Sequence, residues 1–372
     1  MEKQALICLD FFKHGDDIWF IDFLSGGLFV SDLANGSTDL MKKLPIESWH
    51  ENYRSLYVVN GKIYMPPLFA TELLIYEMET KEIKKISVTQ CTKKDQANFI
   101  DIFAYEKYLF FIPMAADGII RMNTITDEID IYNISLDYSD QTGKMNRPKF
   151  RRGCSYNGKI YLAACNGNMI IVFDMASCTY KKININDNKN DGYSLCCCTS
   201  QGMVLVSYDG SNAVILDRQM KPVHIILSGQ EEKFSIALEC GNSVLHIRCA
   251  GDGRAEVIDT EKNSVRIMNL DLGAEKEKFL VESFPENSFT FVAKKLDDKI
   301  WLYSTKRGSL CVLDLEGHKL QEHELIVTGT VKQKITEMRG EKLMHEMTGN
   351  KEEMVREDRI YTLNIWINAI VG

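Results

Sequence analysis

Residues 154–185 read CSYNGKIYLAACNGNMIIVFDMASCTYKKINI, and this stretch decides the fold. It divides into β-prone segments at 154–156, 159–163, 169–173 and 180–185, separated by residues typical of turns. Asn157-Gly158 between the first two segments is a strong hairpin signal, because both residues tolerate a positive φ. The stretch therefore predicts one sheet of four short strands.

The same pattern recurs along the chain. The second strand of each unit begins at an apolar residue, namely Ile18, Ile63, Leu109, Ile160, Val204, Val244 and Ile300. An acid or amide follows 13–15 residues later, namely Asp32, Glu77, Asn123, Asp174, Asp217, Asp259 and Asp314. Four strands in about 40–45 residues is the period of a propeller blade. We therefore predict an all-β fold, a seven-bladed β-propeller of four-stranded blades.

The physical reason for a ring is that these sheets are apolar on both faces, as in the third-strand run Leu73-Leu74-Ile75-Tyr76. Radial stacking covers both faces and leaves only short edges. We expect unit 7 to close the ring by packing on unit 1, without a shared blade. The repeated acid is interpreted as the start of an Asx-type turn into the fourth strand.

We predict that the propeller occupies 1–328 and that a short, partly helical extension occupies 329–372. Asn350 with Glu353 resembles a capping box. Leu363, Trp366, Ile367 and Ile370 have helical spacing, although 363–371 also alternates as a strand would. We expect a helix that docks on the ring; a partner-binding segment is the alternative. The long connections 135–153 and 271–288 are candidate functional loops, and 274–280 is a possible short helix.

Composition limits the function classes. The chain of 372 residues carries 44 basic and 52 acidic residues, which disfavours a general nucleic-acid binder. No apolar run reaches the roughly 18 residues of a membrane span, and the N-terminus reads as the first hairpin instead of a signal peptide. The eleven cysteines are scattered and fit buried thiols in a reducing compartment. We expect a cytoplasmic monomer without nucleic-acid or membrane partners.

The units resemble a known group of propellers. NGKIYL and MIIVFDMASCTYKKI look like kelch-type blades, and AEVIDTEKNSVRIMNL at 255–270 is similar to bacterial YVTN-type repeats. The kelch glycine pair is present only as Gly26-Gly27, and the kelch tryptophan and the Trp-Asp pair of WD-type blades are missing. The resemblance implies a bacterial β-propeller and carries no particular function.

Three motifs fail on chemistry. The segment 153–159 resembles a phosphate loop, but Ile160 follows and no helix is expected there. The segment 187–192 resembles a calcium loop, but Lys189 stands where an oxygen ligand is needed. In the run 196–198, strand alternation sends Cys197 to the face opposite its neighbours. The histidines show no metal spacing, so we expect no metal and no cofactor.

The candidate site is the mouth of the propeller funnel, where the innermost strands begin. By the repeat alignment it includes Trp49, His50, Arg54, Asp101, Arg151, Arg152, Tyr208, Asp209, Asp252, Arg254, Lys306 and Arg307. Arg54 and Arg151 follow the same recurring aromatic position, and Arg152 comes next. Three convergent arginines predict a clamp for a carboxylate or phosphate; pairing of each with a nearby acid is the alternative.

We therefore expect a non-enzymatic binding protein that holds a protein, peptide or small anionic ligand on its funnel face. The rival hypothesis is a propeller enzyme, a lyase or hydrolase similar in class to the streptogramin-lyase type. That enzyme would need a histidine and an acid at the mouth, such as His50 with Asp101 or Asp209.

Overall fold

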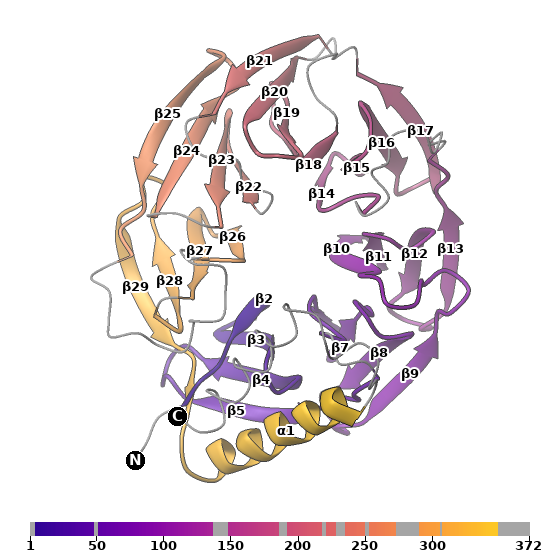
Figure 1. Ribbon diagram of the computed structural model, residues 1–372, viewed down its shortest axis with the longest axis vertical. Helices are drawn as coiled ribbons and strands as arrows, with labels where there is room; N and C mark the ends of the chain where they lie inside the picture. Colours follow the sequence, from indigo (N-terminus) through magenta and orange to yellow (C-terminus); the bar gives the residue numbers. More distant parts are fainter. Residues whose placement is uncertain are drawn as a thin grey trace.

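The computed structural model describes residues 4–47, 51–136, 148–185, 192–217, 221–227, 235–249, 253–272, 290–305 and 307–348. Seven sheets of four antiparallel strands stand around one axis (Figure 1). The predicted seven-bladed β-propeller is confirmed. In every sheet the strands pair in sequence order, so each blade is a simple meander.

Within each blade the strands follow one another from the axis outward. Blade 1 contains β2 (Cys8–His14), β3 (Asp17–Asp22), β4 (Gly27–Asp32) and β5 (Thr38–Lys43). Blade 2 contains β6 (Tyr57–Val59), β7 (Lys62–Met65), β8 (Glu72–Glu77) and β9 (Ile83–Ser87). Blade 3 contains β10 (Phe99–Tyr105), β11 (Tyr108–Pro113), β12 (Gly118–Asn123) and β13 (Ile129–Asn133). Blade 4 contains β14 (Gly153–Tyr156), β15 (Lys159–Ala163), β16 (Met169–Asp174) and β17 (Thr179–Asn184).

The remaining blades follow the same order. Blade 5 contains β18 (Tyr193–Cys198), β19 (Gly202–Ser207), β20 (Asn212–Asp217) and β21 (Pro222–Ile226). Blade 6 contains β22 (Ser235–Cys240), β23 (Ser243–Arg248), β24 (Arg254–Asp259) and β25 (Ser264–Asn269). Blade 7 contains β26 (Ala293–Leu296), β27 (Lys299–Ser304), β28 (Ser309–Leu313) and β29 (Lys319–Glu324). Outside the blades lie β1 (Gln4–Ala5), β30 (Ile326–Val327) and the helix α1 (Gly329–Thr348).

Blade 4 matches the segments predicted from its sequence to within one residue. Tyr156 pairs with Lys159 across a two-residue turn. In that turn Asn157 and Gly158 have φ values of 48° and 71°. Positive φ at both central positions is the geometry that suits the right-handed twist of the flanking strands, so the hairpin prediction is confirmed.

The repeated acid or amide forms the predicted Asx-type turn. In at least five units its side-chain oxygen accepts a hydrogen bond from the backbone N–H two residues on, in the pairs Asp32–Ala34, Asn123–Ile125, Asp174–Ala176, Asp259–Glu261 and Asp314–Glu316. These carboxylates and the Asn123 amide therefore shape the turns into the outer strands.

Both faces of the blades are buried, as the apolar runs predict. Leu73, Leu74, Ile75 and Tyr76 on β8 are all fully buried. Leu74 and Tyr76 belong to the core shared with blade 1, whereas Leu73 and Ile75 belong to the core shared with blade 3. Each blade thus supplies one face to each neighbour.

The ring closes where blade 7 meets blade 1. Each blade keeps its own four strands, as predicted. A short antiparallel pairing of β1 with β30 adds to the packing, with Gln4 opposite Val327 and Ala5 opposite Ile326. The sequence analysis did not include this clasp. It satisfies backbone groups of residues 4–5 and 326–327 that packing alone would leave unpaired.

The helix α1 lies along β5 of blade 1 (Figure 1). Ile335 and Met338 are buried against the ring, and Ile335 joins the core of the closure. Arg339 is fully buried beside Asp22, with 3.6 Å between Nη2 and Oδ2. The helical features predicted at 350–353, 363–370 and 274–280 lie outside the described residues. Over the described ranges, no helix combines the length and apolar character needed to cross a bilayer.

Candidate functional site

The innermost strands begin irregularly in three blades. The pairing register shifts between Cys8 and Phe11 on β2, between Phe99 and Asp101 on β10, and between Tyr193 and Leu195 on β18. Such β-bulges re-aim side chains and are over-represented next to functional sites. Asp10 and Asp101 lie at two of these bulges.

Six charged side chains from five consecutive blades form what we call the axial charge cluster: Lys294, Asp10, Glu51, Arg54, Asp101 and Arg152. Lys294 Nζ lies 2.7 Å from Asp10 Oδ1. Arg54 Nε donates to Glu51 Oε2 over 2.8 Å. Arg152 Nη1 lies 3.9 Å from Asp101 Oδ1, which is too long for a hydrogen bond.

The charges of the cluster act on one another. Burial raises the pKa of Asp101, the charge on Arg152 opposes this shift, and the negative charge of Asp10 adds to it. Burial disfavours the charge on Arg54, but Glu51 outweighs it, with help from Asp10 and Asp101, and raises the pKa of the guanidinium. The charges of neighbouring blades therefore influence Asp101 and Arg54.

The arrangement of the cluster fits recognition of a polar ligand. Ordered by blade as 7, 1, 2, 3 and 4, one side chain from each blade gives alternating signs, in the order Lys294, Asp10, Arg54, Asp101 and Arg152, while Glu51 of blade 2 pairs with Arg54. The cations keep 23–30% of their side-chain surface exposed. A long Arg152–Asp101 separation leaves the guanidinium able to receive a bidentate carboxylate or phosphate.

The predicted arginine clamp is assembled in part. Arg54 and Arg152 both interact electrostatically with Asp101, from either side along the ring. Arg151 instead stacks on Tyr208, with its guanidinium carbon 5.0 Å from the ring centroid, and Nη2 lies 3.5 Å from the tyrosine hydroxyl. Arg151 and Tyr208 therefore tie blade 4 to blade 5.

Two of the other predicted residues, Asp209 and Arg307, have hydrogen-bond partners outside the cluster. Asp209 caps its own turn, because Oδ1 accepts hydrogen bonds from the Ser207 hydroxyl and from the Ser211 backbone at 2.6 and 3.0 Å. Arg307 donates twice to Glu322 on the outermost strand of blade 7. Arg254 is exposed at the start of β24. Trp49, His50, Asp252 and Lys306 lie outside the described residues.

Sequence reasoning missed Asp10, Glu51 and Lys294. A signal existed for Asp10, because Leu9-Asp10-Phe11 and Ile100-Asp101-Ile102 place an acid at the same point of an apolar inner strand. An acid inside such a run is costly to bury unless it has a partner. Comparing the inner strands in this way would have joined Asp10 to Asp101.

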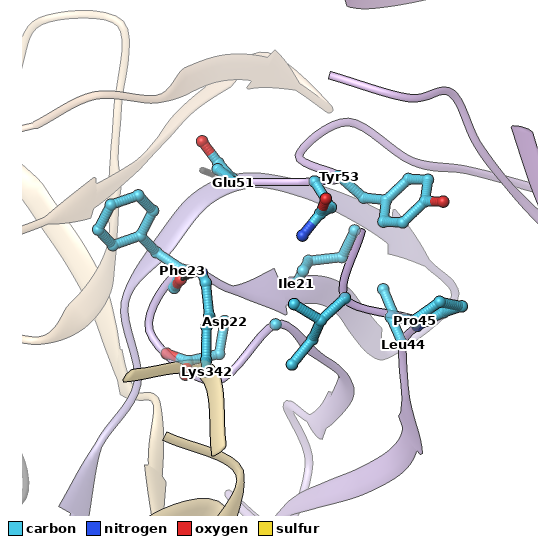
Figure 2. A pocket seen from close by; sticks show the side chains of 11 residues that line it. Ile21, Asp22, Phe23, Leu44, Pro45, Glu51, Tyr53 and Lys342 are labelled. Carbon is cyan, nitrogen blue, oxygen red and sulfur yellow. Dashed lines mark hydrogen bonds between the residues drawn. The ribbon is translucent and has the colours of Figure 1, made fainter. Parts of the chain in front are cut away.

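A small cavity borders the cluster (Figure 2). It is lined by Asp22 and Phe23, by Leu44 and Pro45, by Glu51 and Tyr53, and by Lys342 of α1. Its volume of about 10 Å³ admits no more than a single water molecule. The Lys342 ammonium donates to the Phe23 carbonyl over 2.9 Å. The cavity thus links α1 to the rim of the cluster and is too small for a ligand.

No His, Cys, Asp and Glu side chains of the described residues gather in groups of three or more that could hold a metal ion. His246 meets an acid, with Nδ1 2.8 Å from Glu256 Oε2, but both side chains are buried between blades. Burial lowers the pKa of His246. This pair is sealed away from the axis.

The fold is shared with solved structures. The chain is similar to virginiamycin B lyase from Staphylococcus aureus, with a TM-score of 0.59 and 10% identity over 82% of this chain and 96% of that one. It is similar to a streptogramin B lyase, with a TM-score of 0.54 and 10% identity over 77% and 86%. It is also similar to Hsv2 from Kluyveromyces lactis, with a TM-score of 0.51 and 10% identity over 87% and 100%.

At these identities the likeness shows the propeller fold alone. No protein-family model matches the sequence. No curated protein matches it either. The finer resemblance to kelch-type and YVTN-type blades stays a prediction.

Proposed function

We propose that this protein is a non-enzymatic binding propeller, and that the axial charge cluster holds a peptide or small molecule bearing a carboxylate. The observation that carries the proposal is the alternation of charge around the axis, with Arg152 held only loosely by Asp101 at 3.9 Å. A ligand carboxylate can bridge Arg152 and Arg54, and an ammonium or amide N–H of the same ligand can face Asp101 or Asp10.

The charge balance of the cluster supports a ligand that carries both signs. Three cations and three anions leave no net charge. A purely anionic ligand would meet Asp10 and Asp101 as well as the arginines, and like charges at close range are unfavourable. A peptide terminus or an amino-acid derivative meets each charge with its opposite. The charge balance therefore narrows the predicted ligand class from anions in general to ligands that carry both a carboxylate and a positive or N–H group.

The experiment compares two probes in a thermal-shift assay at low salt: a tripeptide with a free C-terminal carboxylate and the same tripeptide amidated. A ligand that binds only the folded state raises the melting temperature with concentration. We expect the free acid to raise it and the amide to have a weaker effect. Arg152→Gln should remove the difference.

The matched control is Arg121→Gln. Arg121 also pairs with a carboxylate, since its Nη2 atom lies 2.6 Å from Asp130 Oδ2. The two residues lie on β12 and β13, the outer strands of blade 3. The Arg121→Gln protein should keep the same rise in melting temperature with the free acid as the unaltered protein. Equal responses to acid and amide, or an Arg152→Gln protein that responds as before, would refute the proposal.

A second candidate function is acid–base catalysis at the same cluster. The observation that favours it is the raised pKa of Asp101, which burial causes and which is a property of catalytic acids. The histidine predicted to accompany it, His50, lies outside the described residues. Isothermal calorimetry separates the two functions, since binding gives a saturable heat and turnover gives a heat that continues until substrate is exhausted.

We also propose that the protein acts as a bacterial, cytoplasmic monomer. The support is the scatter of eleven cysteines, which suits a reducing compartment. Size-exclusion chromatography with light scattering tests the monomer, and fractionation of the source cell tests the location.

A further inference from the structure

Three cysteines meet where blade 4 packs on blade 5. Cys154 lies on β14, and Cys196 and Cys198 lie on β18, the innermost strands of the two blades. The Sγ atom of Cys154 lies 3.4 Å from that of Cys198 and 3.8 Å from that of Cys196. All three are free thiols in this structure. Residues 154 and 198 are 44 positions apart, so their proximity depends on the ring.

Strand alternation selects these three thiols. Cys196 and Cys198 face blade 4 and share its core, whereas Cys197 faces blade 6 in a different core. Cys196 also donates its S–H to the Tyr161 carbonyl over 3.0 Å. Cys198 has the shorter separation from Cys154. It is therefore the better placed partner for bond formation.

The geometry is close to that of a disulfide. A disulfide has an S–S length of about 2.05 Å, so the 3.4 Å separation must shorten by about 1.4 Å. Rotation of two cysteine side chains can supply a movement of that size. Cys154 is partly exposed, whereas Cys196 and Cys198 are buried. Of the three residues, Cys154 is therefore the least buried and the first candidate for attack on an outside reagent.

We propose that Cys154 and Cys198 form a reversible disulfide that links blade 4 to blade 5, and that Cys196 is the alternative partner of Cys154. The oxidant is a small disulfide of the glutathione class. This inference is independent of the ligand proposed for the axial charge cluster.

The chemistry balances in two exchange steps. The Cys154 thiolate attacks one sulfur of the small disulfide, which forms a mixed disulfide and releases one small thiolate. The Cys198 thiolate then attacks Cys154 Sγ and releases the second. Two protein thiols lose two electrons, the small disulfide is reduced to two thiols, and these take up both protons.

The surroundings make the first step slow at neutral pH. The hydrogen bond with Cys196 lowers the pKa of Cys154, but the contact with Cys198 and burial outweigh it, so that the pKa lies well above the usual value. Because the thiolate is the attacking species, the rate should rise with pH. In the reducing compartment that the sequence predicts, the bond would form when oxidised thiols accumulate.

The experiment treats the reduced, folded, full-length protein with oxidised glutathione at about pH 8.5, near the ordinary pKa of a thiol, and maps disulfide-linked peptides by mass spectrometry without reduction. We expect one main link, Cys154–Cys198, and reversal by dithiothreitol. A disulfide constrains the unfolded chain, so the melting temperature should rise by roughly 5 °C.

Three variants make the result decisive. Cys154→Ser should abolish the link and the shift in melting temperature. Cys198→Ser should move the link to Cys154–Cys196. The control Cys197→Ser, on the same strand but the opposite face, should leave the link unchanged. No link in the folded protein, a main link through Cys197, or an undiminished shift in Cys154→Ser would overturn the proposal; loss of every link in Cys198→Ser would overturn the role of Cys196.

Discussion

Two junctions between neighbouring blades bury their apolar faces with different kinds of contact. Between blades 3 and 4 the core is built around aromatic and branched side chains, with Phe110 and Phe173 edge to face at a centroid distance of 5.8 Å. Between blades 7 and 1 an apolar core is joined by the β1–β30 clasp and by a hydrogen bond from the Tyr303 hydroxyl to the Leu6 carbonyl at 2.6 Å. The closure also receives a buried ion pair from α1.

The difference between the two junctions follows from how far apart the paired blades lie along the chain. Blades 3 and 4 are joined by a direct connection, so they meet at high local concentration. Blade 7 must find blade 1 across almost the whole sequence, and the entropy of closing a loop grows with its length. Directional polar contacts also fix which surfaces meet, whereas similar apolar faces could pair in the wrong order. The closure is therefore expected to be the more polar and the more specific junction.

The largest effect should come from breaking the buried pair at the closure. Asp22→Ala leaves Arg339 buried without its carboxylate and removes the acceptor of the Ile7 and Ser25 backbone N–H groups, each at 2.7 Å. We expect a loss of about 4 kcal/mol in the free energy of unfolding, measured by urea titration. Lys85→Ala, which breaks an exposed pair with Glu72, is the control. A loss below about 1 kcal/mol would mean that the pair contributes little to the closure.

The aromatic junction should be somewhat less sensitive. Phe173→Ala removes a fully buried ring that packs on Phe110 and Tyr132. We expect a loss of about 3 kcal/mol by the same titration, and the loss should not depend on pH because the ring carries no titratable group. Ile125→Ala, at a residue 68% exposed, should change stability very little. A loss from Phe173→Ala as small as that of the control would show that the neighbouring side chains fill the space.

The ion pair of Arg307 with Glu322 lies within blade 7. It allows the contribution of a charge pair inside one blade to be compared with that of the Asp22–Arg339 pair at the closure. Burial opposes ionisation of Glu322, but hydrogen bonds from Arg307 and Ser309 outweigh it and lower its pKa from 4.5 to about 2. The carboxylate therefore stabilises the fold above about pH 4.5, and this contribution is lost as the pH falls towards 2.

Arg307→Gln should cost about 2 kcal/mol at neutral pH, because Ser309 and Lys319 still bond the carboxylate, and this deficit should shrink as the pH falls from about 4.5 towards 2. Parallel titrations of both proteins at each pH measure it. A deficit that stays constant on acidification would assign the effect to lost packing instead of charge.

The smallest effect is expected at the surface of the closure. Lys43 and Glu341 join β5 to α1, and both side chains are about half exposed. Solvent screens such pairs, so Lys43→Ala should cost less than about 1 kcal/mol, and added salt should abolish the cost. A loss approaching that of Asp22→Ala would show that α1 is held by its exposed edge, against our account of the buried pair.

The blades were predictable from sequence because their signals are local. Asn157-Gly158, the recurring acid and the apolar third strands each act within a few residues, and all three appear as predicted. The clasp was not predictable, since strands of two residues have no period to detect. Their pairing exists only after the ring has formed.

The candidate site was predictable in part for the same reason. Arg54, Asp101 and Arg152 follow from their place in the repeat. Asp10 and Lys294 join them only because the blades converge on one axis, whereas Glu51 pairs with Arg54 three residues further along the chain. Asp209 and Arg307 lie at the same end of the ring, but Asp209 accepts a hydrogen bond from Ser207 and Arg307 donates to Glu322. A repeat alignment carries no information on such contacts.

The late closure of the ring also affects how the protein folds during synthesis. Blade 1 leaves the ribosome before blade 7, but the surface formed by Phe11 and Phe20 is covered only when blade 7 and α1 arrive. At translation rates of about 5–20 residues per second, the intervening chain takes roughly 15–60 s to emerge. During that interval blade 1 carries an uncovered apolar face, so chaperones should bind the chain once blade 1 has emerged and release it when blade 7 and α1 have docked.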